Sequence, residues 1–237
     1  MNDRTALVTG ANKGIGFHVA RLLAEEGFRV HVGSRVADRG ERAVAEIGAN
    51  ARLLVLDVTD PGSVARAAAG LDRLDVLVNN AGVQPVTGTP AETGVEAFRQ
   101  TYETNVLGVV AVTNAFLPAL RRSAHPRVVN VSSGTASLAW STAPNPQFAE
   151  GVPRSAAYRS SKAALNALTV LYAQELAEAG FKVNALAPGR RATDLVPGAA
   201  VGGDPAEGAQ GAVRLALLPD DGPTGGFFSW DGTPVPW

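Results

Sequence analysis

The sequence of 237 residues contains no cysteine. Disulfide bonds, thiolate catalysis and cysteine-ligated metal sites are therefore excluded. The motifs G-x-S-x-G and H-E-x-x-H are also missing, and the three histidines, His18, His31 and His125, are far apart along the chain. These absences argue against the hydrolases that depend on those motifs, and we expect no metal site.

A marked excess of charge is lacking as well. The formal net charge is −1 and the isoelectric point is about 6.3, so the chain has no basic footprint for nucleic acid or for an anionic membrane. The most apolar long segment, residues 106–120, is interrupted by Thr113, Asn114 and Pro118 and is too short to span a bilayer. The first residues do not follow the pattern of a signal peptide. We expect a cytoplasmic protein without a nucleic-acid or membrane partner.

Lysine is rare. Of the 21 basic residues 18 are arginine, and the only lysines are Lys13, Lys162 and Lys182. Such a bias is typical of a GC-rich genome. Each remaining lysine is therefore of interest, because arginine does not replace lysine where a compact or titratable ammonium is needed.

Apolar segments with strand character alternate with helical segments along the whole chain. The expected strands cover residues 5–10, 28–35, 52–58, 75–82, 127–134, 181–189 and 224–232, and the expected helices lie at 15–27, 37–47, 94–120, 156–179 and 206–217, with one more beginning at Asp60-Pro61. This alternation predicts a single-domain α/β fold, a Rossmann-like doubly wound parallel sheet of about seven strands with helices on both faces. Ligands bind such sheets outside the carboxyl ends of the strands.

The first strand is followed by a glycine-rich turn with Gly10, Gly14 and Gly16. Glycines at this place allow a tight turn, close approach of a pyrophosphate to the backbone, and close packing of the helix on the strand. The free N–H groups at the start of the next helix favour an anion. We therefore expect a dinucleotide cofactor.

The second strand ends without the carboxylate that usually binds the adenine ribose of NAD. Arg35 stands there instead, and a carboxylate would repel a 2′-phosphate that an arginine can hold. Lys13, inside the glycine turn, adds a second positive charge. We expect NADP(H) rather than NAD(H), with Asp57 accepting a hydrogen bond from the adenine amino group.

Six features follow one another in the order and approximate spacing of the short-chain dehydrogenase/reductase family: T-G-A-N-K-G-I-G at 9–16, N-N-A-G at 79–82, Asn105, Ser132-Ser133, Tyr158-x-x-x-Lys162 and Pro188-Gly189. The chain resembles this family over nearly its whole length. Each feature alone is weak, but together they are specific. The N-K-G-I-G turn and the long connection before Tyr158 are most similar to the carbonyl reductase branch.

The resemblance implies roles for four residues. Tyr158 would protonate the carbonyl oxygen of the substrate during reduction, and Ser133 would hydrogen bond to the same oxygen. Lys162 would lower the pKa of Tyr158 and bind the nicotinamide ribose. Asn105 is a poor residue for a helix interior, which predicts a local bulge; in the family such an asparagine holds a water that links the lysine to solvent.

The resemblance also selects Ser133 over Ser132, because the second serine is the catalytic one in the family. Strand alternation alone says only that the two side chains point to opposite sides. The residues expected to contact NADP(H) are Gly10, Asn12, Lys13, Gly14, Ile15, Gly16, Arg35, Asp57, Val58, Asn80, Ala81, Gly82, Tyr158, Lys162, Pro188, Gly189 and Thr193.

The Tyr158–Lys162 pair sets a physical condition on the site. Acid–base chemistry near neutrality requires a tyrosine pKa about three units below its ordinary value of about 10, or ~4 kcal/mol. One ammonium at ~4 Å supplies ~1 kcal/mol in water but ~4 kcal/mol at an effective dielectric constant of about 20. The pair therefore requires a pocket that is covered from solvent.

Two segments are expected to provide this cover. The connection 134–157 is longer than is usual in the family, and the branch that the chain resembles uses an insertion here for the substrate pocket and to block the usual helix-to-helix dimer. Because the insertion is shorter here, both a homo-oligomer and a monomer are consistent with the sequence. Trp140 and Phe148 within it either lie near the substrate or pin the connection to the protein. Residues 190–211, rich in small side chains, suggest a lid, where Arg190 and Arg191 either bind phosphate or face solvent.

We therefore expect an NADPH-dependent oxidoreductase that transfers hydride between nicotinamide and a small or medium neutral carbonyl or alcohol. The alternatives are an NAD-linked alcohol dehydrogenase working oxidatively and a non-catalytic NADP(H)-sensing protein. The presence of all four catalytic residues disfavours the sensor. A sugar-nucleotide epimerase is disfavoured by the short segment after Gly189.

Overall fold

A computed structural model describes residues 4–85, 87–142, 155–195 and 202–237 of the chain. Its strands are β1 (Thr5–Val8), β2 (Arg29–Ser34), β3 (Ala51–Val55), β4 (Val76–Asn79), β5 (Arg127–Val131), β6 (Lys182–Ala187) and β7 (Phe227–Ser229). They form one seven-stranded sheet in the order β3-β2-β1-β4-β5-β6-β7. Every neighbouring pair is parallel, which confirms the predicted fold class.

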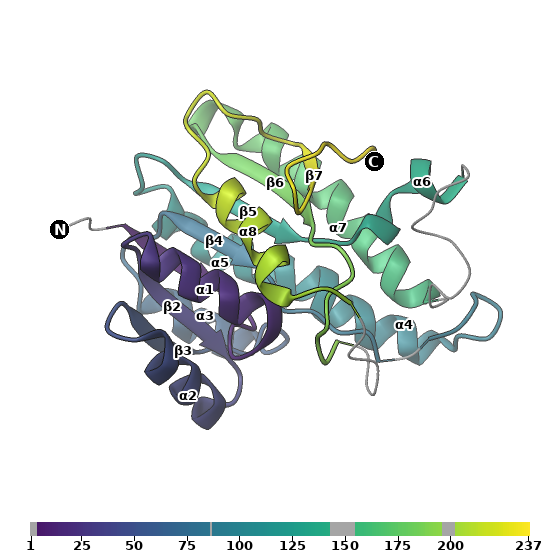
Figure 1. Ribbon diagram of the computed structural model, residues 1–237, viewed down its shortest axis with the longest axis horizontal. Coiled ribbons are helices and arrows are strands. Elements are labelled where there is room, and N and C mark those ends of the chain that lie inside the picture. The colour runs from purple at the N-terminus through teal and green to yellow at the C-terminus, as the bar shows by residue number, and fades with distance from the viewer. Residues whose placement is uncertain (1–3, 86, 143–154, 196–201) are drawn as a thin grey trace.

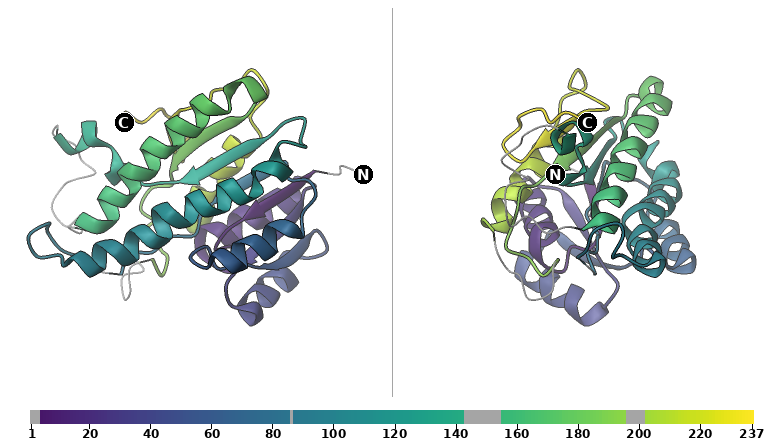
Figure 2. Two further views of the ribbon diagram at one scale, coloured as in Figure 1. Left: turned by 180° about the vertical axis from the view of Figure 1, so that it is seen from behind. Right: turned by 90° about the vertical axis from the view of Figure 1, so that its right-hand side faces the viewer.

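Helices cover both faces of this sheet (Figures 1 and 2). One face carries α1 (Gly14–Glu25), α2 (Ala37–Ile47) and α8 (Pro205–Ala216), and the other carries α3 (Pro61–Ala69), α5 (Gly108–Leu120) and α7 (Ala156–Glu175). The side chains of β1 show how the core is divided: Ala6 and Val8 pack on the first side, while Leu7 packs on the second. Because successive side chains of the central strands point to opposite faces of the sheet, these strands contribute to two hydrophobic layers.

The long helical stretch predicted for 94–120 is continuous but not regular. It consists of α4 (Val95–Tyr102), a π-helical turn η1 (Glu103–Leu107) and α5, so the bulge expected at Asn105 is confirmed. By length and composition alone, Val95–Leu120 is long and apolar enough to cross a membrane, because the helix extends well beyond the apolar segment 106–120. Its side chains Val112 and Phe116 are fully buried in the core behind the sheet, which accounts for the apolar composition.

The connection after β5 contains two short elements that the sequence did not predict. The 3₁₀ turn η2 (Gly134–Ala136) and the helix α6 (Leu138–Thr142) are too short to produce a periodic pattern. Phe148 and the rest of 143–154 lie outside the described residues, and so do residues 196–201 of the expected lid.

The expected lid over 190–211 must be corrected at its second half. Pro205–Ala216 forms α8, and Ala209 and Ala212 of this helix are fully buried in the core shared with α1. Gly211 approaches the backbone of Trp230 so closely that a Cβ there would lie 2.8 Å from the Trp230 Cα. The small residues of this region therefore serve close helix packing and not the mobility that their composition suggested.

Candidate active site

The glycine turn after β1 is held to the loop after β4. Gly10 and Gly14 have φ values of 61° and 58°, which favour glycine. A Cβ on Gly16 would lie 2.3 Å from Asn80 Nδ2, so this position has no room for a side chain. The Asn80 amide donates to the carbonyl oxygens of Thr9 at 2.9 Å and Gly10 at 3.2 Å.

Thr9 completes this connection and was missed in the sequence. Its Oγ1 accepts hydrogen bonds from the backbone N–H groups of Asn80 and Ala81, both at 3.0 Å. Thr9 is the first residue of the glycine-rich motif, but its role as an acceptor for the loop after β4 becomes visible only in the structure. Asn80, expected to contact the cofactor, fixes the shape of the turn through these bonds.

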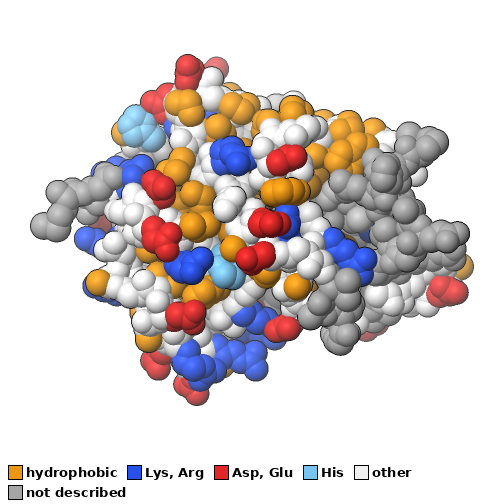
Figure 3. All heavy atoms as spheres, in the orientation of Figure 1, with side chains coloured by type: hydrophobic (Ala, Val, Ile, Leu, Met, Phe, Trp, Pro, Cys, Tyr) orange, Lys and Arg blue, Asp and Glu red, His pale blue; other side chains and the backbone are white. Residues whose placement is uncertain are grey.

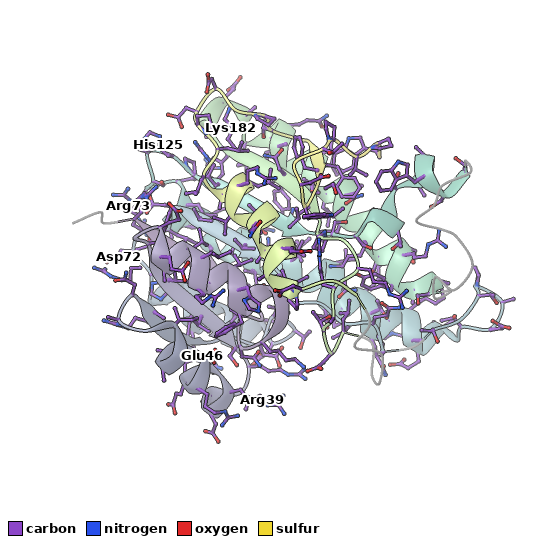
Figure 4. The ribbon with its side chains drawn as sticks, viewed as in Figure 1. Arg39, Glu46, Asp72, Arg73, His125 and Lys182 are labelled. Carbon is purple, nitrogen blue, oxygen red and sulfur yellow. The ribbon has the colours of Figure 1, made fainter. Side chains whose placement is uncertain are left out.

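A cleft of about 640 Å³ runs along the carboxyl edge of the sheet. All residues expected to contact the cofactor line it except Gly189. The cleft also brings in Arg39, which was not predicted from the sequence although it lies one helical turn after Arg35. Both arginines are exposed, Figure 4 labels Arg39 on α2, and basic side chains gather over this end of the molecule in Figure 3.

Two carboxylates border the positively charged end of this cleft. Burial raises the pKa of Asp57, but hydrogen bonds from the N–H and hydroxyl of Thr59 and the charge of Arg35 outweigh it, so the pKa is below its ordinary value. Lys13 pairs with Asp194 at 3.0 Å across the cleft, and both side chains are largely exposed. Such an exposed pair contributes little energy and can exchange partners with an incoming phosphate.

Tyr158, Ser133 and Lys162 meet at the middle of the same edge. Tyr158 and Lys162 lie one turn apart on α7 and are 9% and 4% exposed. The Lys162 amine donates to the carbonyl oxygen of Val131 at 2.8 Å and lies 5.9 Å from the centroid of the Tyr158 ring. The Ser133 hydroxyl hydrogen bonds with the Tyr158 side chain.

Burial dominates the pKa values of this pair. It raises the pKa of Tyr158 to about 12, and the hydrogen bond with Ser133 opposes only part of that rise. It lowers the pKa of Lys162 to about 8, so the amine is still mainly an ammonium at neutral pH. The protein therefore buries a positive charge beside Tyr158, as the pair requires. Its side chains alone do not lower the pKa of Tyr158 below the ordinary value.

Asn105 is fully buried behind the pair. Its Oδ1 accepts from Val83 N at 2.8 Å, and its Nδ2 donates to Val83 O and to Ser161 Oγ, both at 3.0 Å. A Cβ on Gly82 would lie 3.3 Å from Asn105 Oδ1 and 3.5 Å from Lys162 Nζ. The asparagine and the lysine thus border the same space beside Gly82, and the water expected there stays a prediction.

The two adjacent serines have different surroundings. Ser132 is 2% exposed, and its hydroxyl donates to Asn166 Oδ1 at 2.6 Å, behind Lys162. Ser133 faces Tyr158 instead. Ser132 borders the cofactor cleft, but its hydroxyl is occupied by Asn166, whereas the Ser133 hydroxyl is the one that meets Tyr158. The contact with Tyr158 supports the choice of Ser133.

The segment after β6 is anchored by Arg191. Its guanidinium donates to the Pro188 carbonyl at 2.7 Å, pairs with Glu207 of α8 and stacks over the Trp230 ring at 4.5 Å. Arg191 therefore holds Pro188 in place rather than binding a phosphate or facing solvent. Arg190 is exposed and does not line the cleft, whereas the Thr193 side chain lies beside Gly14 in it.

Of the two interpretations of Trp140, the structure supports the packing one. Its ring packs against the cluster of Ala185, Ala187, Phe227 and Val235 and does not line the cofactor cleft. Gln84, which lines the cofactor cleft, was also missed. Its side chain is buried and donates a 2.5 Å hydrogen bond to Ser155, which borders the second cleft.

None of the described site residues lies at the opposite end of the sheet, where the strands begin. Lys182, the third lysine, lies there with Asp72, Arg73 and His125 (Figure 4), at the start of β6. Within the described residues no group of histidine, aspartate and glutamate side chains is arranged to hold a metal ion.

Residues 4–200 match the family model described as short chain dehydrogenase. The chain belongs to the short-chain dehydrogenase/reductase family. It is 35% identical to (-)-isopiperitenone reductase of Mentha piperita over 97% of both chains, and 37% identical to (+)-neomenthol dehydrogenase of Arabidopsis thaliana over 95% of this chain and 96% of the relative. The NADPH-bound carbonyl reductase from chicken fatty liver superposes with a TM-score of 0.86 at 27% identity, covering both chains completely.

Membership of the family establishes the general activity. The chain is an oxidoreductase of a family that uses nicotinamide cofactors, and its relatives are named as reductases and dehydrogenases of carbonyl and alcohol compounds. The alignment with the Mentha reductase spans 312 positions, more than the 237 residues of this chain, so that relative carries segments that this chain lacks.

Gly16→Ala is expected to weaken binding of the nicotinamide dinucleotide by at least about tenfold, or ~1.4 kcal/mol. The added Cβ would lie 2.3 Å from Asn80 Nδ2 and 2.8 Å from Gly10 O, so the turn must shift. Gly94→Ala is the matched control, because no neighbouring atom lies within 4 Å of its added Cβ. Fluorescence titration with NADPH measures both variants, and equal affinities would contradict the packing of the turn on Asn80.

Lys162→Met should change how stability depends on pH. The lysine pKa is about 8 in the folded protein and about 10.4 in an unfolded chain, so in this range the unfolded chain binds the proton more strongly. The wild type should therefore gain stability relative to the variant as the pH rises from about 8 to about 10, by about 1 kcal/mol per pH unit. Urea unfolding measures the difference, and a constant difference would show that burial does not lower the pKa of Lys162 in the folded protein.

Proposed function

We propose that the protein is an NADPH-dependent reductase of neutral, mainly hydrocarbon ketones or aldehydes, with Tyr158 as the general acid. The observation that carries this proposal is the meeting of Tyr158, Ser133 and the buried Lys162 ammonium beside the cofactor cleft. Few arrangements other than carbonyl–alcohol chemistry need a tyrosine, a lysine and a serine hydroxyl at one point beside a dinucleotide site.

The residues of the cleft fit a dinucleotide. The turn has no room for side chains at Gly16, and it precedes the free N–H groups at the start of α1, where a diphosphate would lie. Pro188, Tyr158 and Lys162 also line the cleft, and the nicotinamide half would lie beside them, while the Thr193 side chain lies beside Gly14 of the turn. When bound, the nicotinamide ring supplies the hydride for reduction.

NADPH is proposed over NADH on the charge of the cleft. Arg35 and Arg39 line the end next to β2, and Lys13 is held by an exposed aspartate from which it can move. An adenosine 2′-phosphate there would gain charge-assisted hydrogen bonds from these groups. The NADPH-bound state of the chicken carbonyl reductase, a relative in structure, supports the same choice.

The protein side chains then divide the chemistry. Ser133 donates a hydrogen bond to the carbonyl oxygen of the substrate, and Tyr158 gives its proton to the same oxygen. Lys162 stabilises the tyrosinate that is left, and the Val131 carbonyl holds the lysine amine in place at 2.8 Å.

The energy required of these groups is substantial. The pKa of Tyr158 must fall from about 12 to near neutrality, which corresponds to about 7 kcal/mol. One ammonium supplies ~4 kcal/mol at an effective dielectric constant of about 20. The value of about 12 already includes the hydrogen bond with Ser133, so the positive nicotinamide of the oxidised cofactor is the group available for the remainder.

The proposed substrate class follows from the walls of the cleft near Tyr158. Gln84, Pro85 and Leu195 line the cleft, and none of them carries a charge that would select an ionised substrate. The names of the relatives, (-)-isopiperitenone reductase and (+)-neomenthol dehydrogenase, refer to neutral cyclic compounds. We therefore propose a neutral, cyclic ketone or the corresponding alcohol.

A screen of NADPH oxidation against cyclic ketones, aryl ketones, aldehydes, diketones and quinones tests this function. Turnover of a neutral ketone is expected, and Tyr158→Phe should reduce it by at least about a hundredfold while NADPH binding stays nearly unchanged. Turnover retained by Tyr158→Phe would overturn the mechanism. Tight NADPH binding without turnover of any class would indicate the sensor instead.

Arg35→Ala and Arg39→Ala should raise the KM for NADPH by about tenfold or more, ~1.4 kcal/mol, and leave the KM for NADH nearly unchanged. Arg42→Ala is the matched control, because Arg42 is an exposed arginine of the same α2 that does not line the cleft. Equal effects on the two cofactors would remove the charge argument for NADPH.

A further inference from the structure

Ser133 is surrounded by more hydrogen-bonding groups than its proposed role requires. It precedes η2, and its Oγ accepts from the backbone N–H of Thr135 at 3.3 Å. The hydroxyl of Thr135 lies 2.9 Å from the same Oγ. The third neighbour is the side chain of Tyr158.

A serine hydroxyl has one proton to donate and two lone pairs with which to accept. The Thr135 N–H takes one lone pair of Ser133. If Ser133 also donated its proton to Thr135, it could not donate to Tyr158 or to a substrate oxygen. If Thr135 donates instead, both lone pairs of Ser133 are filled and its proton points away from Thr135.

We propose that Thr135 is a positioning residue, which donates its hydroxyl proton to Ser133 and so keeps the Ser133 proton free for Tyr158 or, when substrate is bound, for the substrate oxygen. In this row of hydrogen bonds Thr135 donates to Ser133 and Ser133 donates to Tyr158. Each hydroxyl is a donor once, and the Tyr158 proton stays available to a substrate in the cleft. This inference rests on the proposed roles of Ser133 and Tyr158.

The position of Thr135 fits such an indirect role. Its side chain does not line the cofactor cleft but faces a second, mainly apolar cleft with Phe98 and Leu138. Its own backbone is tied to α7, because Arg159 Nε donates to the Thr135 carbonyl at 3.4 Å. Thr135 can therefore reach the reacting atoms only through Ser133, while α7 keeps it in register with Tyr158.

The proposed direction of donation, from Thr135 to Ser133 to Tyr158, is the one that would favour ionisation of Tyr158. Burial raises the pKa of Tyr158, and the hydrogen bond with Ser133 opposes that rise. A donor stabilises the ionised phenolate, whereas an acceptor of the phenol proton would stabilise the neutral form. A Ser133 hydroxyl that donates to Tyr158 would favour the phenolate in this way, and it can do so only if Thr135 does not take the same proton.

Thr135→Val tests the proposal, because it removes the hydroxyl and keeps the branched shape. Thr135→Ser keeps the hydroxyl and should restore the wild-type behaviour. Thr142→Val is the matched control: this exposed threonine of α6 bonds only to the carbonyls of Leu138 and Ala139 among the described residues. Thermal melts show whether each variant is folded.

The first readout is the pH profile of kcat/KM for alcohol oxidation with NADP⁺, in which Tyr158 must be ionised. Thr135→Val should move the acidic limb up by about one pH unit and lower kcat at neutral pH by about tenfold, with the KM for NADP⁺ unchanged. Thr135→Ser and Thr142→Val should keep the wild-type profile. An unshifted profile in a folded Thr135→Val variant, or a limb that moves to lower pH, would overturn the proposal.

The second readout does not depend on turnover. The chain has three tyrosines, so the ring-carbon NMR signal of Tyr158 in the NADP⁺ complex can be assigned by its loss in Tyr158→Phe. Its titration midpoint should rise in Thr135→Val and not in Thr135→Ser. If no substrate is turned over but this shift appears, the proposed function fails and the positioning role stands. If a substrate is turned over but the shift is missing, the proposed function stands and the positioning role fails.

Discussion

The structure depends on keeping one lysine charged while it is buried. Lys162 is 4% exposed, and among the described residues the Val131 carbonyl at 2.8 Å is the one hydrogen-bond partner of its amine. An isolated ammonium in such a place is costly, so the surroundings must be rigid and partly polar. The end of β5 supplies the carbonyl, and the neighbouring Gly82 leaves room beside the amine for Asn105. The π-helical turn, the serine pair and the start of α7 are all arranged around this charge.

Much of this arrangement could be predicted because the motifs are local. The glycine turn, Tyr158 with Lys162, and Arg35 each lie at or next to a strand end that hydrophobic periodicity places well. A parallel sheet brings all these ends to one edge, so residues far apart in sequence meet without any further information. Even the irregular turn at Asn105 was predictable, since an asparagine in the middle of an apolar helix has to satisfy its amide.

The features that could not be predicted depend on contacts between segments. Thr9 and Asn80 both lie in motifs that the sequence shows, but they bond to each other only after β1 and β4 pair, so the motifs did not indicate this contact. Trp140 could equally have faced a substrate or the core until β7 was placed beside it. The segment 205–211 was misjudged because small residues favour both mobility and close helix packing. Arg39 was within reach of sequence reasoning, because its one-turn spacing from Arg35 is visible.

The bonds between Thr9, Asn80 and the glycine turn have a consequence for how the cofactor site can change. These bonds fix the diphosphate region rigidly to the central strands of the sheet. At the other end of the cleft, Arg35 and Arg39 are solvent-exposed side chains just before and within α2. The two halves of the cleft are therefore modular. Substitutions at the exposed end can retune the preference between the two nicotinamide dinucleotides without repacking the interior, so this preference can drift over evolutionary time while the chemistry at Tyr158 is conserved.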